Sequence, residues 1–363
     1  MFRIILLCLL SLTAQADIAG CKVFPDNNHW NTRVDKLPVH KDSVQWVANI
    51  GAGTPIHMDF GAGQWEGINI GIPFNIVNPA DKPTTFNFLY ADESDNGPYP
   101  IGGNPLVEGG SDRHFITLDT RDCKLYELFN YRPPNADSGA VWDLKTNATR
   151  PFGWTSADAA GLPILPGLIR YDEPIINHAL RFTASKTHGS IAPASHATRG
   201  SAGISYPDQP PLGARYRLKA SFDTTPYDTR LQPILTALKT YGMILADNGG
   251  EWYISGTHDE RWDNDLLATL HNIRGAAFEV VDTSCTLTLS TDKRVVRASG
   301  GMVNVTVTSS CDWLPDAGSP WLKPIRASPI LLSIVVARND SKLIRSGRIT
   351  VRDKYILIQQ LGY

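Results

Sequence analysis

Residues 284–325 read SCTLTLSTDKRVVRASGGMVNVTVTSSCDWLPDAGSPWLKPI, and residues 345–363 read RSGRITVRDKYILIQQLGY. In both stretches, short runs of alternating apolar and polar residues are separated by turn residues at intervals of roughly 8–12 residues. The alternation predicts strands over 286–290, 303–308, 331–336, 348–351 and 355–359. We therefore expect residues 283–363 to form a small Ig-like β-sandwich.

The order of motifs in this region also resembles a known family. The motifs that follow one another along the sequence are Cys285, Gly300-Gly301, Val303-Asn304-Val305, Cys311-Asp312-Trp313, Trp321, Arg345-Ser346-Gly347-Arg348-Ile349 and the final Ile358-Gln359-Gln360-Leu361-Gly362. This string is similar to the BACON family of Ig-like modules. Such modules usually accompany enzymes that act on glycans, so the resemblance implies a glycan as the partner of the preceding domain.

The first sixteen residues predict export. MFRIILLCLLSLTAQA places one Arg before an apolar run and ends in Ala14-Gln15-Ala16, the order of a secretory signal peptide. Residues 18–21, IAGC, also fit a lipoprotein cleavage box, but Asp17 and Gln15 separate them from the apolar run. We expect signal cleavage after residue 16 and a secreted or periplasmic protein, with lipidation of Cys21 as the less favoured alternative.

Cysteine usage agrees with export. Cys8 leaves with the signal peptide, and an even number of cysteines remains: Cys21, Cys123, Cys285 and Cys311. Four cysteines allow three connectivities. Cys285 and Cys311 lie near the start of one expected strand and the end of another, where one bridge would link both. We therefore expect the disulfides Cys285–Cys311 and Cys21–Cys123.

Composition narrows the class of protein. The chain has 34 basic and 36 acidic residues, no basic run, 30 Gly and 25 Pro. We expect no nucleic-acid partner, no membrane span and a loop-rich, mostly β protein that is a monomer. The sequence contains no G-x-S-x-G, H-E-x-x-H, Walker or dinucleotide motif, which disfavours serine-hydrolase, zincin, nucleotide and NAD chemistry.

Residues 17–282 predict one large β domain, a β-sandwich or jelly-roll-like body with two short helices. Alternating runs predict antiparallel strands over 86–90, 115–118, 124–129, 179–183, 215–220, 242–246 and 251–255. Apolar residues at helical spacing predict helices over 229–240, with Gly242 as the stop, and over 264–272, with Asp263 as the cap.

The body resembles a recurrent family of exported bacterial proteins. The resemblance rests on strings such as FPDNNHWN (24–31), HMDFG (57–61), EGGSDRH (108–114), GWTSADAAGLPILPGLIRYDE (153–173) and YGMILADNGGEWYISG (241–256). We associate that family with polysaccharide-degrading bacteria, but it has no established reaction. The resemblance therefore implies that the body shares the fold of that family and comes from a similar bacterium. It implies no reaction mechanism.

Acidic residues on irregular loops are the candidate catalytic groups of a glycoside hydrolase, which needs one protonated and one ionised carboxyl group. We expect Asp158 and Glu173 to form this pair, with Asp112 and Asp172 as the next candidates and His114 as a proton shuttle. Each has a structural alternative, since acidic side chains also stabilise turns.

Candidate substrate-binding residues accompany these acids. Trp154 has an aromatic face that suits a pyranose ring, and Arg113 offers a bidentate anion clamp. Tyr171, Arg181 and Trp252 complete the set, although each tryptophan also fits a core role. In the segment 247–253, Asn248-Gly249-Gly250 predicts a hairpin turn, from which Asp247 or Glu251 could project.

The acidic turn that contains Asp92 and Asp95 is a candidate Ca²⁺ site, although a solvated turn is the simpler interpretation. We expect no other metal or cofactor, because the histidines lack ligand spacing. Two alternatives to a hydrolase remain open. A polysaccharide lyase would use His114, Arg113, Arg181 and Tyr171 on uronic acids, and a non-catalytic glycan-binding or adhesion protein would need only aromatic and polar loops.

Overall fold

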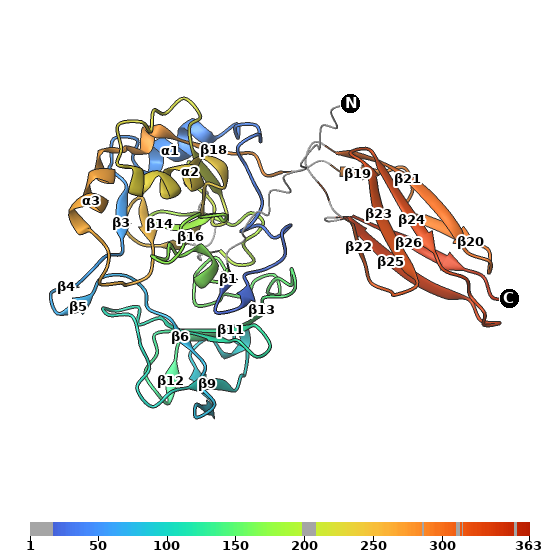
Figure 1. The fold of residues 1–363 in the computed structure, drawn as a ribbon, viewed down its shortest axis with the longest axis horizontal. Coiled ribbons are helices and arrows are strands. Elements are labelled where there is room, and N and C mark those ends of the chain that lie inside the picture. The colour runs from blue at the N-terminus through green and yellow to red at the C-terminus, as the bar shows by residue number, and fades with distance from the viewer. Residues whose placement is uncertain (1–16, 198–207, 285–286, 310–312, 314, 352–353) are drawn as a thin grey trace, which may run out of the picture. The chain divides into compact units, whose positions relative to one another are not determined.

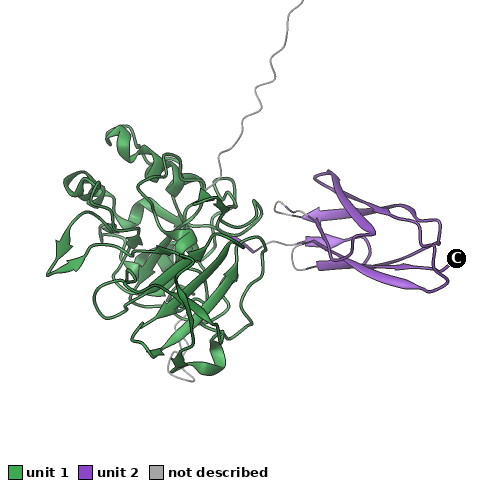
Figure 2. Cartoon of the chain, turned by 60° about the horizontal axis from the view of Figure 1, so that its bottom comes forward, with its two compact units in different colours: residues 1–281 green, residues 282–363 purple. Residues whose placement is uncertain are grey.

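The computed structural model describes residues 17–197, 208–284, 287–309, 313, 315–351 and 354–363. The expected signal peptide, residues 1–16, lies outside this range. The chain divides into two compact units, residues 1–281 and 282–363, each with its own apolar core (Figure 2). No helix in the described part is long and apolar enough to cross a membrane.

Over the described residues the fold is mostly β, as the sequence predicts. The body contains a six-stranded sheet in the order β18-β15-β16-β14-β17-β3 and a four-stranded sheet in the order β13-β11-β10-β6 (Figure 1). The first comprises β3 (His57–Asp59), β14 (Leu180–Ala184), β15 (Arg215–Leu218), β16 (Met243–Asn248), β17 (Tyr253–Ser255) and β18 (Phe278–Val280). The second comprises β6 (Asn75–Ile76), β10 (Phe115–Asp119), β11 (Lys124–Phe129) and β13 (Ser138–Asp143).

Short elements connect these sheets. The short strands are β1 (Asp17–Ile18), β2 (Cys21–Lys22), β4 (Gln64–Trp65), β5 (Ile68–Asn69), β7 (Lys82–Thr84), β8 (Asn87–Phe88), β9 (Tyr99–Ile101) and β12 (Asn135–Ala136). The 3₁₀ turns are η1 (Ala91–Glu93), η2 (Leu165–Gly167), η3 (Thr229–Leu231), η4 (Thr269–Asn272) and η5 (Gly275–Ala277). The strand expected over 86–90 is therefore reduced to β8.

Antiparallel pairing, which the alternation predicts for the strands of the body, holds for some pairs, such as β10 with β11 and β15 with β16, but not for all. β14 runs parallel to β16, β17 to β3, and β10 to β6. The reason lies in the connections, since the chain between β14 and β16 includes β15 and a helix and so returns to the same end of the sheet before β16 begins.

Three α-helices occur in the described residues: α1 (Ser43–Ile50), α2 (Gln232–Thr240) and α3 (Asn264–Ala268). The sequence predicts the last two. The Asp263 carboxylate accepts a hydrogen bond from the Leu266 N–H at the start of α3. Gly242 ends α2 with a φ of 65°, and a Cβ there would lie 2.1 Å from the Tyr216 carbonyl oxygen, so glycine is required at this stop.

One part of the core of the body lies between the helices and one face of the six-stranded sheet. Trp252 is fully buried and stacks between Phe182 and Phe278, with Tyr216 packed against its edge. α1 packs against β18 and α2 against β15 (Figure 1). Each large side chain buried here stabilises the fold by roughly 1.5–3 kcal/mol, so this face is closed to ligands.

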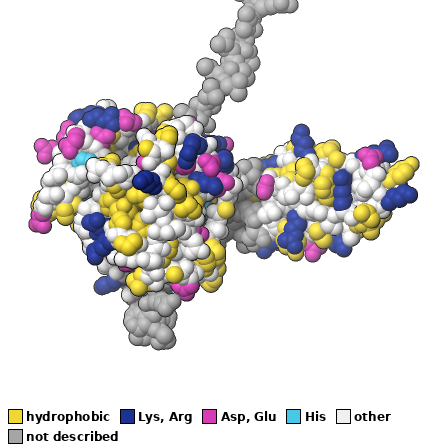
Figure 3. All heavy atoms as spheres, turned by 90° about the horizontal axis from the view of Figure 1, so that it is seen from below, with side chains coloured by type: hydrophobic (Ala, Val, Ile, Leu, Met, Phe, Trp, Pro, Cys, Tyr) yellow, Lys and Arg dark blue, Asp and Glu magenta, His cyan; other side chains and the backbone are white. Residues whose placement is uncertain are grey.

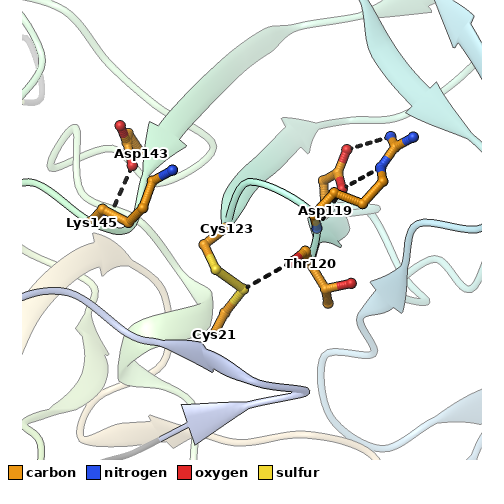
Figure 4. Close-up of a disulfide and its surroundings, with 7 residues drawn as sticks. Cys21, Asp119, Thr120, Cys123, Asp143 and Lys145 are labelled. Atoms are coloured by element: carbon orange, nitrogen blue, oxygen red, sulfur yellow. Dashed lines mark hydrogen bonds and ion pairs between the residues drawn. A yellow bond between two sulfur atoms is a disulfide. The ribbon is translucent and has the colours of Figure 1, made fainter.

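One disulfide ties the start of the body to the four-stranded sheet. Cys21 in β2 is bonded to Cys123 in the turn between β10 and β11, and the two residues are 102 positions apart (Figure 4). The bridge confirms the expected Cys21–Cys123 pair and agrees with an extracellular or periplasmic protein. Cys285 and Cys311 lie outside the described residues.

The tail unit is a sandwich of two four-stranded sheets, β19-β21-β24-β23 and β20-β26-β25-β22. Its strands are β19 (Leu287–Leu289), β20 (Lys293–Val296), β21 (Gly301–Ser309), β22 (Pro315–Ala317), β23 (Leu322–Ser328), β24 (Leu331–Val336), β25 (Arg345–Val351) and β26 (Lys354–Gln360). Residues 282–363 contain 11 Lys and Arg against 6 Asp. Lys and Arg side chains are spread over the face of this unit shown in Figure 3.

Candidate active site

The second face of the six-stranded sheet is polar. Strand alternation turns Phe182, Ile254 and Met58 toward the core and their neighbours to the opposite face. Strand register then aligns these neighbours in two rows. Arg181, Ser255 and Asp59 form one row across β14, β17 and β3, and Asp247, Thr183, Tyr253 and His57 form the next across β16, β14, β17 and β3. We call these seven residues the polar face.

A buried ion pair lies at the centre of the polar face. Arg181 Nε lies 2.9 Å from Asp158 Oδ2, and its Nη2 lies 2.6 Å from Asp158 Oδ1. Arg181 Nη1 also donates to Ser255 Oγ at 2.6 Å. Burial opposes the charge of the guanidinium, but Asp158 and Asp247 outweigh it and raise the pKa of Arg181. Asp158 has no exposed surface, so its carboxylate holds Arg181 and is not accessible to a substrate.

Asp247 occupies a different environment from Asp158. Its Oδ2 is 3.3 Å from Arg181 Nη2, and its Oδ1 accepts the Asn248 N–H at 2.8 Å. About 18% of its side-chain surface is exposed, so the carboxyl group meets solvent. Burial, reinforced by the charge of Asp158, raises the pKa of Asp247 to about 7. Asp247 therefore exchanges a proton near neutral pH.

Glu108 and His114 lie beside this ion pair, on the segment that leads into β10. His114 Nδ1 is 2.5 Å from Glu108 Oε2, and its Nε2 is 3.1 Å from the Ala157 carbonyl oxygen. Burial acts against both charges, but each partner stabilises the other. The pKa of His114 is therefore raised to about 9 and that of Glu108 is lowered. Glu108, with 20% of its side-chain surface exposed, is an ionised carboxylate at neutral pH.

The two accessible carboxyl groups thus flank His114. One ring nitrogen of His114 and one carboxylate oxygen from each of Asp158 and Asp247 all lie within 4.8 Å of one another. Glu108 is bonded to the same imidazole. The site therefore holds two carboxyl groups whose pKa values are shifted in opposite directions, upward for Asp247 and downward for Glu108.

The same group of residues does not suit a metal ion. His114, Asp158 and Asp247 are close enough to share a cation. However, the Arg181 guanidinium already contacts both oxygens of Asp158 and one of Asp247, and both nitrogens of His114 have hydrogen-bond partners. A cation would need to displace this charge, so these residues fit an ion pair better than a metal site.

Glu127, in the middle of β11, lies next to the cluster but points into the protein. It is fully buried and accepts hydrogen bonds from the backbone N–H groups of Ile164 and Leu165 and from the Trp142 indole. Burial raises its pKa to about 7, although the two backbone donors oppose the shift. Glu127 therefore anchors the end of the 151–164 segment, which carries Asp158.

The sequence predicts that Asp158 and Glu173 form the catalytic pair. In the structure, however, each carboxylate binds a different arginine. Glu173 Oε1 is 2.8 Å from Arg170 Nη2, and its Oε2 is 3.2 Å from His178 Nε2. These contacts outweigh burial and lower the pKa of Glu173. Both oxygens are engaged in a separate network, which holds the 170–178 turn.

The neighbouring candidates Asp172 and Tyr171 belong to a third, exposed group. Asp172 forms a bidentate pair with Arg261, at 2.6 and 2.8 Å, and the Arg261 guanidinium lies 4.4 Å from the centre of the Tyr171 ring. Tyr171 also packs edge-on against Trp262. These contacts link two loops of the body and engage the residues proposed for catalysis and binding.

Of the remaining candidates, one lies near the polar face and the others make contacts that support the fold. Asp112 is exposed and lies near Asp59, and its neighbour Arg113 donates to the Tyr131 carbonyl oxygen at 3.1 Å. Trp154 is half-buried beneath the Arg150 guanidinium. Trp252 lies in the core and offers no exposed face to a sugar.

The acidic turn at Asp92 and Asp95 has an internal partner. Asp95 Oδ2 is 2.6 Å from Arg150 Nη1 and accepts the Val141 N–H at 2.8 Å. Asp92 is exposed in η1. Arg150 thus supplies at Asp95 the positive charge that a calcium ion would bring.

Glu108, Asp59 and His57 are not among the candidates that the sequence gives, and Asp247 is considered there only as a residue that could project from a turn. A usable signal existed for His57 and Asp59, because polar residues alternate with core residues in three short segments, 57–59, 181–183 and 253–255. The register that joins these segments is a long-range property and is visible only in the fold.

Comparisons with known proteins cover little of the chain. No protein-family model matches it, and no curated protein does. One similar solved structure is a Bacteroides ovatus GH5 xyloglucanase in complex with a XXXG heptasaccharide, at 19% identity over 22% of this chain and 19% of that chain, with a TM-score of 0.20. Another is a protein from Bacteroides thetaiotaomicron, at 14% identity over 21% of this chain and 87% of that chain, with a TM-score of 0.18. The chain spans about a fifth of the xyloglucanase, so the body is interpreted from its own residues.

Proposed function

We propose that the body is an exported glycoside hydrolase that uses Asp247 as general acid and Glu108 as general base or nucleophile. The observation that carries the proposal is the pair of opposite pKa shifts on either side of His114, with both carboxyl groups reaching solvent. A glycoside hydrolase needs this division between a protonated and an ionised carboxyl group. We infer that the substrate is a glycan from two resemblances, that of the tail to the BACON modules and that of the body to the family associated with polysaccharide degraders.

Each neighbouring residue has a defined task in this mechanism. Asp158 adds negative charge beside Asp247 and so helps to keep it protonated, while Arg181 holds Asp158 in place. Protonated His114 donates to Glu108 and fixes its orientation. Asp247 gives its proton to the leaving glycosidic oxygen. Glu108 then activates a water molecule or attacks the anomeric carbon itself, and the spacing of the two groups around the bound sugar decides which.

The test is hydrolysis of a panel of polysaccharides, measured as new reducing ends. Asp247→Asn and Glu108→Gln should each lower kcat by about 10²–10⁴-fold, because each removes one proton-transfer group. Asp265→Asn, an exposed carboxylate in α3, is the matched control and should keep wild-type activity. Wild-type turnover in both site variants would refute the assignment.

The other two classes give different readouts in the same assay. A lyase would produce an unsaturated sugar with new ultraviolet absorbance, and a binding protein would retain the glycan without any product. The lyase product is not expected, because Arg181 and His114, two of the residues that a lyase would use, are buried, whereas Glu108 and Asp247 are partly exposed.

A further inference from the structure

Trp65 differs from the other tryptophans of the chain in its exposure. All nine tryptophans lie in the described residues, and the other eight are buried or half-buried, whereas 73% of the surface of Trp65 is exposed. No aromatic ring or cation among the described residues packs on its indole. Tryptophan is highly buried on average, so an indole with open faces is available to a ligand.

Trp65 lies at the tip of the β4–β5 hairpin, which projects from the body at the left of Figure 1. The two strands are joined by Glu66-Gly67, with φ values of 52° and 79°, as a type I′ turn requires. Trp65 and Ile68 are cross-strand partners beside this turn, so their side chains share one face of the hairpin. Gln64 and Asn69 occupy the other face, where the two side chains are hydrogen-bonded at 2.9 Å. The hairpin therefore has one apolar and one polar face.

The apolar face of the hairpin rests on the loop that carries Glu108. Ile68 packs against Gly109, and a Cβ at Gly109 would lie 1.9 Å from Ile68 Cγ2, so glycine is required at this contact. At Gly110 a Cβ would meet nothing within 4 Å, so the loop is open beyond the contact. Backbone and cross-strand spacings place Trp65 Cβ at most about 14 Å from Glu108 Cα. The exposed indole thus lies on the face of the hairpin that is turned toward the proposed catalytic loop.

The hairpin and the loop are both anchored by asparagine side chains. Asn264 in α3 bonds the N–H and the carbonyl oxygen of Ala62, both at 2.9 Å, just before the hairpin. Asn75 in β6 bonds the N–H and the carbonyl oxygen of Leu106 in the same way, at 2.8 and 2.9 Å. A binding residue on anchored backbone loses less conformational freedom when a ligand is bound.

The size and chemistry of the exposed surface suit a sugar ring. Trp65 and Ile68 are two side chains, whereas a stable protein interface buries about 800 Å² on each partner. One indole face matches the apolar C–H face of a single sugar ring, by analogy with aromatic stacking. A glycan whose scissile bond lies beside Glu108 continues along its chain in both directions, and the indole is within reach of one of those extensions.

From this geometry we infer that Trp65 is a sugar-stacking residue of a subsite that lies away from the cleaved bond, so that the substrate is an extended glycan chain. The inference rests on the proposed function for the position of that bond. It goes further by assigning a binding residue on an element that the mechanism does not use.

The first experiment measures binding without turnover. The full-length Asp247→Asn variant is titrated calorimetrically with a mixed-linkage glucan, a xylan, a galactomannan and polygalacturonate, and at least one of them should bind. Adding Trp65→Ala should weaken that binding about tenfold, as expected when one aromatic stacking contact is lost, and Trp65→Phe should weaken it less. Val44→Ala, at an exposed apolar side chain of α1, is the control and should leave the affinity unchanged. Binding of none of the polymers, or an unchanged affinity in Trp65→Ala, would overturn the inference.

The second experiment separates the subsite from the reacting atoms. In the otherwise wild-type protein, Trp65→Ala should raise KM for the same polymer about tenfold and leave kcat within about twofold. A lowered kcat at an unchanged KM would overturn the inference. So would a Trp65→Ala protein that keeps its glycan affinity but no longer binds phosphatidylglycerol vesicles, because the hairpin would then contact a membrane. If Trp65→Ala weakens glycan binding while Asp247→Asn still hydrolyses the polymer, the subsite stands and only the proposed mechanism fails.

Discussion

Two carboxyl groups near one imidazole differ because their surroundings differ. Asp247 is partly desolvated and lies next to the negative charge of Asp158, which favours its protonated form. Glu108 accepts a hydrogen bond from the protonated His114, which favours its ionised form. Both pKa shifts are caused by neighbouring groups and not by the residue type, so both should change when those neighbours are changed.

The pH dependence of kcat/KM should be bell-shaped. Activity should fall as the pH rises above about 7, because Asp247 loses the proton that it donates. It should also fall on the acid side as Glu108 becomes protonated, below the ordinary glutamate pKa of 4.5. Initial rates across buffers of constant ionic strength measure both limbs, and activity that keeps rising above pH 8 would contradict the role of Asp247.

Asp247 should also make stability depend on pH. Its pKa is raised from 3.8 to about 7 in the folded protein, so the stability due to its protonated form is complete below about pH 4 and is lost as the pH rises through 7. Asp247→Asn cannot ionise and should escape this loss. Urea unfolding at pH 5 and pH 8 should therefore show the variant gaining stability relative to wild type at the higher pH. A difference that is the same at both values would contradict the shift.

Sequence reasoning at this scale finds part of the cluster. Asp158, His114 and Arg181 are all candidates from the sequence, and the fold brings them together. Asp247 is assigned there to a hairpin turn, but β16 extends through it to Asn248 and the turn follows. Glu173 and Asp172 share a loop context with Asp158, yet Glu173 is bound by its neighbour Arg170 and Asp172 by the distant Arg261. Partners from distant segments decide each role, and a local motif does not reveal them.

At the scale of elements, Glu127 links the four-stranded sheet to the segment that carries Asp158. It lies in β11 of the four-stranded sheet and holds the backbone at Ile164 and Leu165, where the segment with Asp158 ends. This segment has little regular structure, and its position depends on such side-chain bonds.

Removing the Glu127 carboxyl group should destabilise the body. Glu127→Ala leaves three buried N–H donors, two from the backbone and the Trp142 indole, without their acceptor and creates a cavity, with an expected loss of about 2–4 kcal/mol. Glu127→Gln keeps one acceptor oxygen and should lose less. Chemical denaturation at pH 6 measures both, and equal stability of Glu127→Ala and wild type would show that the segment is held by other contacts.

There is a physical reason why the sequence predicts some elements and misses others. β10 and β11 alternate strongly and appear within a residue of their predicted ranges. α1 is missed because it spans only eight residues, has no acidic residue in its first turn and makes no side-chain cap bond. Its burial of Trp46, Val47 and Ile50 is a tertiary effect that overrides weak local signals.

At the scale of the whole molecule, the disulfide closes a long loop. Replacing both Cys21 and Cys123 with Ala frees 102 residues of the unfolded chain and should lower the stability of the body by about 2–5 kcal/mol. The wild-type protein treated with a reductant should show the same decrease in its urea midpoint. A reduced protein as stable as the oxidised one would contradict this estimate.

The two units have separate cores, with no residue common to both. Residues 17–281 expressed alone should therefore keep the thermal midpoint and the turnover of the body in the full chain. Calorimetry of the full chain should resolve a second transition for the tail. A body that unfolds or loses turnover when the tail is removed would show that the units depend on each other.

The most direct test of the central claim is a carboxyl ¹³C NMR titration of the full-length protein, with Asp247→Asn, Glu108→Gln and Glu127→Gln used to assign the signals. The account predicts one carboxyl resonance titrating at about 7 that disappears in Asp247→Asn, and a second that disappears in Glu127→Gln. It also predicts that Glu108 titrates below 4.5. If Asp247 and Glu108 both titrate at their ordinary values, the site holds no matched acid and base, and the proposed mechanism is wrong.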